Sequence, residues 1–424
     1  MKIELCSLFS GCGAFEKALS KTNFDYKIAA YCEIDKYAAC AYSAIHGVSE
    51  DLNLGDVSKV NTKDIPYFNM LTWGFPCQDI SLAGKQAGVK IGTRSGLYYE
   101  GYRILKDRLP KYSIIENVKN LTSKKHIEQF RMILQDLKDL GYKNHWGVLN
   151  AKGFGVPQNR ERVFIVSILG DGEFDMPVET KSNIRLIDIL ETEVDEKYYV
   201  SSKMLKGFVG HNKNHEGKTG FVWKPRDING VASCIRANGA LCPTDNTFAI
   251  PIKEATKKGY AIAQEGDSIN ISQPNSKTRR GRVGNQVANT LLTGCEQCVV
   301  EPKRLGGLFD KDGTKHQAGA IYDSSAISPT LDTAQGGWRQ PCIPTETRIR
   351  RLTPLEYWRL MGFDDSDFYK AKKALNDKFY NGKDRSDSQL YKIAGNSIVV
   401  NVLEAIFNNL IGGHREIKEQ LELF

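Results

Sequence analysis

The sequence predicts an α/β fold accompanied by a smaller second domain made mostly of strands and loops. Two observations carry this prediction. Strand-like and helix-like patterns alternate along the first part of the 424 residues, and helical periodicity fades after about Ile184. We expect three parts: residues 1–184 with the main sheet, residues 185–345 as the smaller domain, and residues 346–424 packing back onto the first part.

Short apolar runs predict the strands of the sheet, and apolar residues at helical spacing predict its helices. The expected strands are Ile3–Phe9, Tyr26–Cys32, Met70–Trp73, Tyr112–Glu116 and Val163–Ile168. The expected helices are Ala14–Ser20 and Ile127–Leu140, the second closed by Gly141 as a C-cap. This alternation is typical of a parallel sheet.

Helical patterns return after Arg348. Thr353 as N-cap, Pro354 at the first helical position and Glu356 in a capping box predict a helix start. A last helix, from about Ser397 to Ile411, carries an apolar stripe that we expect to dock onto the N-terminal sheet. Three segments between these parts look alike and fit either degenerate repeats or ordinary hairpins: Ala232–Ile235, Ala288–Leu292 and Ser328–Leu331.

Composition narrows the class of protein. No run approaches the roughly twenty apolar residues of a membrane span, and the acidic Glu4 interrupts any signal peptide. Ten scattered cysteines favour a reducing compartment, and Cys295 with Cys298 lacks a second zinc-ligand pair, so we expect no metal. The net charge is +8, and residues 201–345 hold nineteen Lys and Arg against twelve Asp and Glu. This surplus indicates a polyanionic partner.

A glycine loop follows the first expected strand. Phe9, Gly11, Cys12 and Gly13 open a helix, where the backbone can approach a ligand closely, although the third glycine of a dinucleotide fingerprint is absent. Acidic residues stand at the ends of the next strands: Glu33 followed by Ile34, and Asp56 followed by Val57. The ordered set predicts a nucleoside cofactor, with Glu33 on ribose hydroxyls and Asp56 on an adenine amine.

One cysteine lies in a turn after a buried strand. Gly-Phe-Pro-Cys-Gln, Gly74 to Gln78, would lift the Cys77 thiol to the sheet edge, where it is a candidate nucleophile; the alternative is a buried structural cysteine. Glu116 ends another apolar strand, where desolvation would raise its pKa. The run from Gln158 to Arg162 is either a surface ion-pair run or a source of arginines pointing into the same cleft.

These residues, in this order, resemble the cytosine-C5 DNA methyltransferases of bacteria and their phages, over nearly the whole chain. The similar motifs are the glycine loop, the proline-cysteine turn, Glu116-Asn117-Val118, Gln158–Arg162, Arg351–Pro354 with Met361–Phe363, and Ala394–Ile398. The resemblance implies a Rossmann-like, S-adenosylmethionine-dependent methyltransferase sheet. One departure is Ile34, where many members carry an aromatic residue.

The resemblance also implies roles for residues. Cys77 would add to cytosine C6, making C5 nucleophilic; Glu116 would bind N3 and the exocyclic amine; Arg162 would contact O2 and steady Glu116. Asn117 would fix the loop, Pro76 would orient the pocket wall, and Arg160 would belong to the catalytic group. The cofactor set would further include Asn396 and Ser397, and S-adenosylhomocysteine would be the product.

Recognition of DNA would require base flipping. Residues Gln78 to Gly96 suit a loop that closes over the base, with Gln78, Ser81, Lys85 and Arg94 as DNA contacts. By resemblance, Thr330-Leu331 with Gly336-Gly337 is the expected recognition element, and Thr290-Leu291 is its rival. Double-stranded DNA is the expected partner of a monomer in a bacterial or phage-infected cell, with a cognate restriction endonuclease left open.

Three other functions compete with this interpretation. An RNA cytosine methyltransferase would need little of the long second domain. An oxidoreductase based on the glycine loop leaves Cys77, Glu116 and Arg162 unexplained. A catalytically dead DNA-binding protein would be expected to lack Cys77 or Glu116, and the chain has both.

Overall fold

The computed structural model describes residues 2–76, 94–180, 183–198, 230–235, 246–249 and 349–412, single residues 226 and 237, and short strands between 252 and 322. The chain forms two compact units. The first contains Met1–Val194, Ile228–Asn246 and Leu352–Phe424, and the second contains Asp195–Asp227 and Thr247–Arg351. Predictions for Cys77, Gln78, Ser81, Lys85, Thr290, Leu291, Thr330, Leu331, Gly336 and Gly337 fall outside the described residues.

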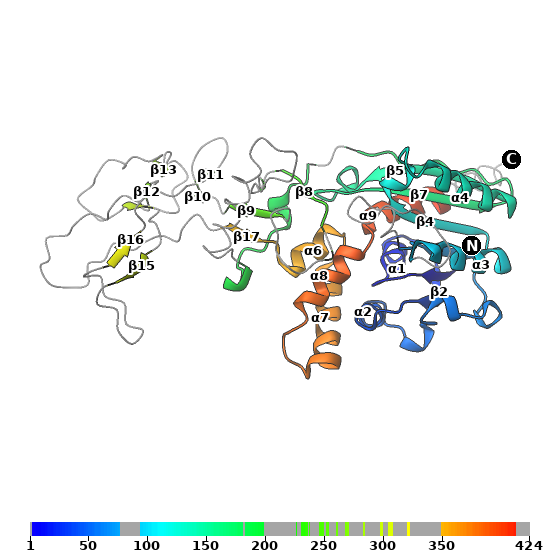
Figure 1. The fold of residues 1–424 in the computed structure, drawn as a ribbon, viewed down its shortest axis with the longest axis horizontal. Coiled ribbons are helices and arrows are strands. Elements are labelled where there is room, and N and C mark those ends of the chain that lie inside the picture. The colour runs from blue at the N-terminus through cyan, green and yellow to red at the C-terminus, as the bar shows by residue number, and fades with distance from the viewer. Residues whose placement is uncertain are drawn as a thin grey trace, which may run out of the picture. The chain divides into compact units, whose positions relative to one another are not determined.

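A six-stranded sheet forms the centre of the first unit (Figure 1). Its strand order is β2-β1-β3-β4-β7-β5. The strands are β1 (Ile3–Leu8), β2 (Tyr26–Cys32), β3 (Met70–Trp73), β4 (Tyr112–Val118), β5 (Tyr142–Asn150) and β7 (Glu161–Leu169). The bounds predicted for β2 and β3 are confirmed, whereas β4 and β7 extend beyond theirs.

The sheet is mixed, not parallel as the alternation of patterns predicted. β1 to β4 pair in parallel, but β7 is antiparallel to both β4 and β5. The reason is the link between β5 and β7, which contains a short 3-10 turn, Ala151–Phe154, and the two-residue strand β6 (Gln158–Asn159). Without a crossover helix, consecutive strands pair as an antiparallel hairpin.

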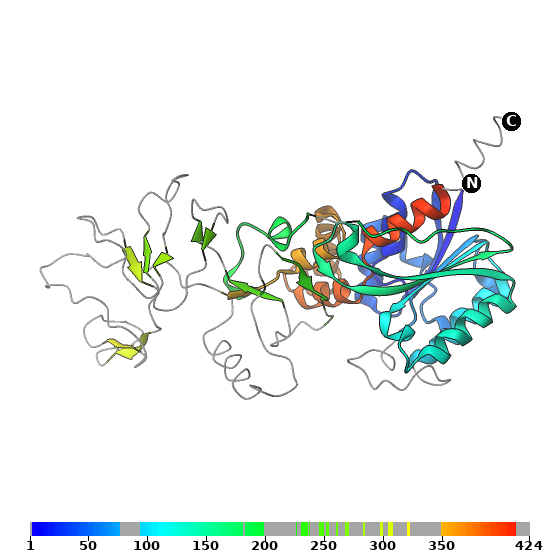
Figure 2. The same ribbon diagram turned by 90° about the horizontal axis from the view of Figure 1, so that it is seen from above.

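The first unit contains helices from both ends of the chain. The N-terminal helices are α1 (Ala14–Ser20), α2 (Lys36–His46), α3 (Tyr98–Arg108) and α4 (Ile127–Asp139), and the C-terminal helices are α6 (Pro354–Leu360), α7 (Asp365–Tyr380), α8 (Asp387–Asn396) and α9 (Val400–Phe407). The red α9 runs beside the blue N-terminal elements in Figure 2, and the Phe15 and Phe407 rings are 6.4 Å apart. α2 packs on α7 through Tyr37 and Phe379, at 4.6 Å.

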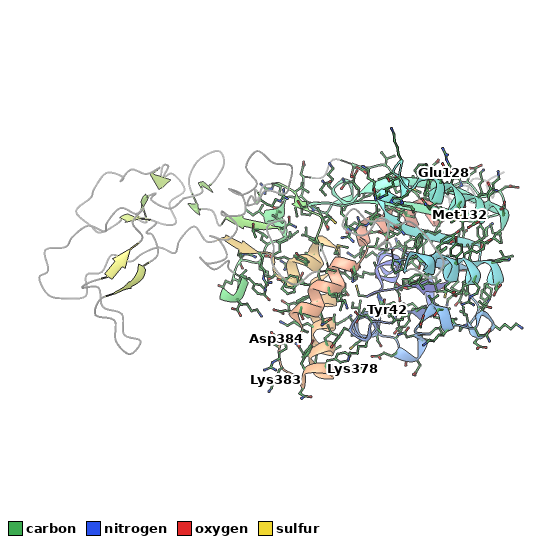
Figure 3. The ribbon with its side chains drawn as sticks, viewed as in Figure 1. Tyr42, Glu128, Met132, Lys378, Lys383 and Asp384 are labelled. Carbon is green, nitrogen blue, oxygen red and sulfur yellow. The ribbon has the colours of Figure 1, made fainter. Side chains whose placement is uncertain are left out.

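The main core lies between the sheet and helices α3 and α4. Trp73 of β3 stacks on Tyr98 of α3, with ring centroids 5.6 Å apart. α4 places Phe130 and Ile133 in this core while Glu128 remains exposed, as its apolar spacing requires (Figure 3). Burial of these apolar side chains holds α3 and α4 against the sheet and so stabilises the strands whose ends are described below.

The capping box predicted for α6 is confirmed: Thr353 Oγ1 accepts from Glu356 N, and Glu356 Oε2 accepts from Thr353 N. The predicted last helix begins later than expected. Ser397 and Val399 have extended backbones, so α8 ends at Asn396 and α9 begins at Val400. This break interrupts the stretch Asp387–Gly412, which by length and composition alone would reach across a membrane and is mostly buried in the protein.

Two stretches that the sequence assigned to the middle domain lie with the first unit. Residues 185–194 contact α6 through the Glu191 N–H, which donates to Glu356 Oε1 at 2.8 Å. Strand β8 (Ala232–Ser233) pairs in parallel with β6. Both contacts join segments distant in sequence.

Short strands make up most of the described part of the second unit, which also contains a 3-10 turn, Glu196–Tyr198. They form small antiparallel sheets from β9 (Thr247–Ala249) with β17 (Ile349–Arg351), β10 (Ile252–Lys253) with β11 (Tyr260–Ala261), β12 (Ser268–Asn270) with β13 (Val283–Gly284) and β14 (Gln297–Val299), and β15 (Arg304–Gly307) with β16 (Ala320–Tyr322). The strands predicted for this region are confirmed in its described residues.

Candidate active site

A cavity of about 390 Å³ lies where strands β1 to β4 end. Ligands of open α/β sheets bind at this edge. The predicted site residues that line it are Phe9, Gly11, Glu33, Ile34, Asp56, Val57, Pro76, Glu116, Asn117, Arg160, Arg162 and Asn396. Residues from both ends of the chain therefore meet in one cavity.

The glycine loop after β1 has an unusual backbone. Phe9, Gly11 and Gly13 all have positive φ, at 56°, 57° and 82°. A Cβ on Gly13 would lie 2.1 Å from His46 Nε2, so only glycine fits there. The same His46 nitrogen lies 3.1 Å from the Cys12 carbonyl oxygen and supports the loop from α2.

Glu33 holds this loop through its carboxylate. Glu33 Oε2 accepts from Gly11 N at 2.8 Å, and Oε1 accepts from Asp35 N at 2.7 Å. Burial raises the pKa of Glu33, while these backbone donors act in the opposite direction. The Gly11 N–H is thus already bonded within the protein.

Two neighbours of Glu33 complete this end of the cavity. Asp56 caps a 3-10 turn and accepts from Ser58 N and Oγ, and these hydrogen bonds lower the pKa of Asp56. Ile34 leaves 76% of its surface exposed, an unusual position for an isoleucine. This end therefore offers carboxylate acceptors beside an apolar face.

The other end of the cavity contains a charged pair. Glu116 Oε1 lies 3.0 Å from Arg162 Nε, and both side chains are largely buried. Burial raises the pKa of Glu116, and the positive charges of Arg162 and Arg160 partly oppose this. A Cβ on Gly74 would lie 3.2 Å from Glu116 Oε2, so glycine leaves space beside the second oxygen.

Two further predicted residues support this end. Asn117 Nδ2 donates to the Phe75 carbonyl at 3.2 Å, which ties β4 to the segment leading to Pro76. Arg160 lines the cavity, but its guanidinium donates to backbone carbonyls, most closely to Ser397 O at 2.7 Å. Its bonding partners are therefore structural.

Three predicted cofactor residues do not line the cavity. Cys12 and Ser397 are buried, with Cys12 Sγ 3.7 Å from Ser397 Oγ, and Gly13 supports the loop instead. Burial raises the pKa of Cys12 to about 12. Arg94 begins a 3-10 turn, Arg94–Leu97, but its side chain is outside the described residues.

The sequence reasoning missed one pair at the rim. Lys392 Nζ lies 2.5 Å from Asp35 Oδ2, and both residues line the cavity. Asp35 also caps α2 by accepting from Tyr37 N at 2.9 Å. The sequence could have indicated this pair, because each residue lies close to a predicted cavity residue. Asp35 follows Glu33 by two residues, and Lys392 precedes Asn396 by one helical turn.

Comparison with known proteins identifies the family. The model of the C-5 cytosine-specific DNA methylases matches residues 3–412. The orphan methyltransferase M.SPRI of Bacillus phage SPR is 33% identical, over 99% of this chain and 100% of its own length. The type II methyltransferase M2.ScrFI of Lactococcus lactis subsp. cremoris is 32% identical, over 84% of this chain and 71% of its own length.

Solved structures show the same fold. The Dnmt2 methyltransferase of S. pombe has a TM-score of 0.58 at 18% identity and covers 98% of this chain and 99% of its own. The Entamoeba histolytica methyltransferase EhMeth has a TM-score of 0.57 at 16% identity and covers the same shares. Because the family model matches residues 3–412, nearly the whole chain, this protein belongs to the C-5 cytosine-specific DNA methylases.

Proposed function

We propose that this cavity is where the methyl donor and a cytosine flipped out of duplex DNA meet. The observation that carries the proposal is the placing of the Glu116–Arg162 pair in the same cavity as Glu33 and Asp56. Methylation of cytosine C5 with S-adenosylmethionine is the activity of the family. The roles of individual residues are inferred from the family resemblance and, for the described residues, from their positions in the cavity.

The cavity suits S-adenosylmethionine. Its volume lies in the range of about 300–1,000 Å³ typical of small-molecule sites. Ionised carboxylates accept only, and each Glu33 oxygen keeps a lone pair for a ribose hydroxyl beyond its bond to a backbone N–H. Asp56 would accept from the adenine amine, and Ile34 would supply an apolar surface. When bound, the cofactor supplies an electrophilic methyl group on a sulfonium.

The base end provides the matching groups for cytosine. Glu116, with its raised pKa, would hold a proton toward N3 and accept from the exocyclic amine. Arg162 would donate to O2 while keeping Glu116 in place. Cys77, which follows Pro76 in the chain, would add its thiolate to C6 and leave after C5 has lost its proton.

The second unit is proposed to read the DNA sequence. Its region of the chain carries most of the surplus positive charge, which suits contacts to phosphates. Thr330-Leu331 and Thr290-Leu291 remain the candidate recognition elements. We place the enzyme, as a monomer, inside a bacterial cell or an infected host, where it would protect DNA, with or without a cognate endonuclease.

A methyl-transfer assay tests this function. Purified protein, S-adenosylmethionine with a labelled methyl group and mixed-sequence duplex DNA should give 5-methylcytosine, measured by nucleoside mass spectrometry. Bisulfite sequencing of the product then reads the target sequence. Label found only in RNA, or on adenine, would contradict the proposal.

Cys77→Ser is the matched variant for this assay. Serine keeps the size of the side chain but is a much weaker nucleophile at neutral pH. We expect methyl transfer to be abolished while DNA binding, measured by mobility shift, is retained. Substantial residual transfer would remove Cys77 from the proposed role.

A further inference from the structure

Arg160 is a buried arginine whose hydrogen bonds join three segments of the first unit. Its side chain donates from Nη2 to Ser397 O at 2.7 Å and to Gly395 O at 3.3 Å. From Nη1 it donates to Ile235 O at 3.3 Å. Only 5% of the residue is exposed. No carboxylate is among these hydrogen-bond acceptors.

Gln158 makes parallel contacts two residues earlier. Its Nε2 donates to Leu360 O at 2.7 Å, and its Oε1 accepts from Ile235 N at 3.2 Å. Gln158 is fully buried. Both side chains therefore bond to Ile235 and to a C-terminal segment of the chain.

Three residues of this segment have different partners. Gln158 lies in β6, Arg162 lies in β7, and Arg160 lies between the two strands. Gln158 and Arg160 bond to backbone groups, whereas Arg162 pairs with Glu116 at 3.0 Å. The motif thus divides into a supporting part and a part that faces the reacting base.

We propose that Arg160 is a positioning residue that fixes the cofactor side of the cavity by holding the backbone on both sides of Asn396. Gly395 and Asn396 line the cavity, and the two C-terminal carbonyls that Arg160 binds belong to Gly395 and Ser397. Gln158 anchors the same three-segment junction. The inference rests on the proposed function only for the identity of the ligand.

The charge on Arg160 makes this arrangement stronger than a neutral one. Hydrogen bonds from a charged donor contribute more than neutral ones, and a guanidinium offers five donors in a fixed plane. Burial lowers the pKa of Arg160 to about 10, with Arg162 acting in the same direction, so the group stays charged at neutral pH. Replacement by Gln removes the charge and most of the N–H donors.

The test measures binding of S-adenosylhomocysteine by calorimetry in the absence of DNA. Arg160→Gln should raise the Kd by about tenfold, which is a loss of roughly 1.4 kcal/mol of binding free energy, because the variant holds the Gly395 and Ser397 carbonyls less firmly. The kcat at saturating cofactor should fall less than about threefold, because Arg160 acts on the base only indirectly, through its charge near Glu116. A loss confined to kcat would overturn the proposal.

Arg108→Gln is the matched control. Arg108 also donates to three backbone carbonyls, those of Thr62, Ile65 and Pro66, none of which lines the cavity. We expect its melting temperature to fall while its Kd is unchanged. Equal weakening of binding in both variants would show general loosening and overturn the specific role.

Arg160→Lys provides a second variant if Arg160→Gln folds poorly. Lysine keeps the charge with a single donor group, so its Kd should lie between those of the wild type and the Gln variant. Wild-type affinity in Arg160→Lys would contradict a role for the planar guanidinium and its several N–H donors. Because binding is measured without DNA, failure of the wild type to methylate DNA would count against the proposed function and leave this result separate.

Discussion

The two ends of the cavity hold buried carboxylates in contrasting ways. Glu33, at the end proposed for the cofactor, accepts backbone N–H groups on both oxygens. Glu116, at the end proposed for the base, pairs through one oxygen with a side chain, Arg162. Burial raises the pKa of both carboxyl groups. The burial is similar, but the partners differ.

The different partners suit the different roles proposed for the two carboxylates. Backbone N–H donors are held in place by the fold, so Glu33 keeps a fixed orientation and remains an acceptor. A side-chain partner leaves Glu116 Oε2 beside Gly74, and both residues line the cavity. A carboxyl that can gain or release a proton suits the site where charge develops. Under the proposed function, one end of the cavity would position the cofactor and the other would transfer protons.

The largest effect is expected at the base end. Glu116→Gln keeps the shape but cannot hold and release a proton, so kcat should fall about a hundredfold or more. The Kd for S-adenosylhomocysteine should stay within about twofold, since the change lies at the other end of the cavity. Single-turnover kinetics and calorimetry measure the two quantities. Weaker cofactor binding with an unchanged kcat would reverse the assignment of the two ends.

The converse change is Glu33→Gln. Its amide would present one NH₂ group to a backbone N–H donor, Gly11 or Asp35, where the native oxygen accepts. We expect the cofactor Kd to rise about tenfold, with kcat at saturation nearly unchanged. A drop in kcat comparable to that of Glu116→Gln would remove the contrast.

A smaller effect concerns stability and pH. Because burial raises the pKa of Glu116, the folded protein holds this proton more tightly than the unfolded chain. The stabilisation is complete below the ordinary carboxyl pKa of 4.5 and is lost as pH rises through the raised folded value. The free energy of unfolding of the wild type, relative to Glu116→Gln, should therefore fall with rising pH. Urea titrations of both proteins measure it; a difference that grows with pH would contradict the prediction.

The smallest effect is expected at the rim. Lys392→Met removes the ion pair with Asp35 but keeps most of the aliphatic part of the side chain. Because exposed ion pairs contribute about 0–1 kcal/mol, the cofactor Kd should change less than about fivefold. High salt should reduce the difference. Lys378→Met is the control, because Lys378 pairs with Glu50 near the end of α7, outside the cavity lining (Figure 3). An equal change in both variants would exclude a role at the rim.

Local patterns predicted much of the fold. Strands β2 and β3, helix α1 and the capping box of α6 follow from a few neighbouring residues each. The position of β7 between β4 and β5 did not follow, because pairing of distant strands has no local signal. The late start of α9 depends on the extended backbone at Ser397.

The site shows the same limit. Residue types at the expected strand ends predicted Glu33, Asp56 and Glu116 as cavity residues, and all three line it. The strand end expected at Asp56 was wrong, because Asp56 caps a 3-10 turn instead. The motif alone grouped Arg160 with Arg162, yet Arg160 bonds to Gly395 and Ser397, more than 230 residues away. Such partners become visible only when the chain is folded.

Trapping with DNA that contains 5-fluorocytosine tests the central claim most directly. Fluorine at C5 cannot leave as a proton does, so a covalent adduct should accumulate when S-adenosylmethionine is present. Peptide mass mapping then identifies the modified residue among the ten cysteines. We predict an adduct on Cys77 in the wild type and none in Cys77→Ser. An adduct on another cysteine, or none in an enzyme that methylates cytosine, would contradict the proposed meeting of donor and base in this cavity.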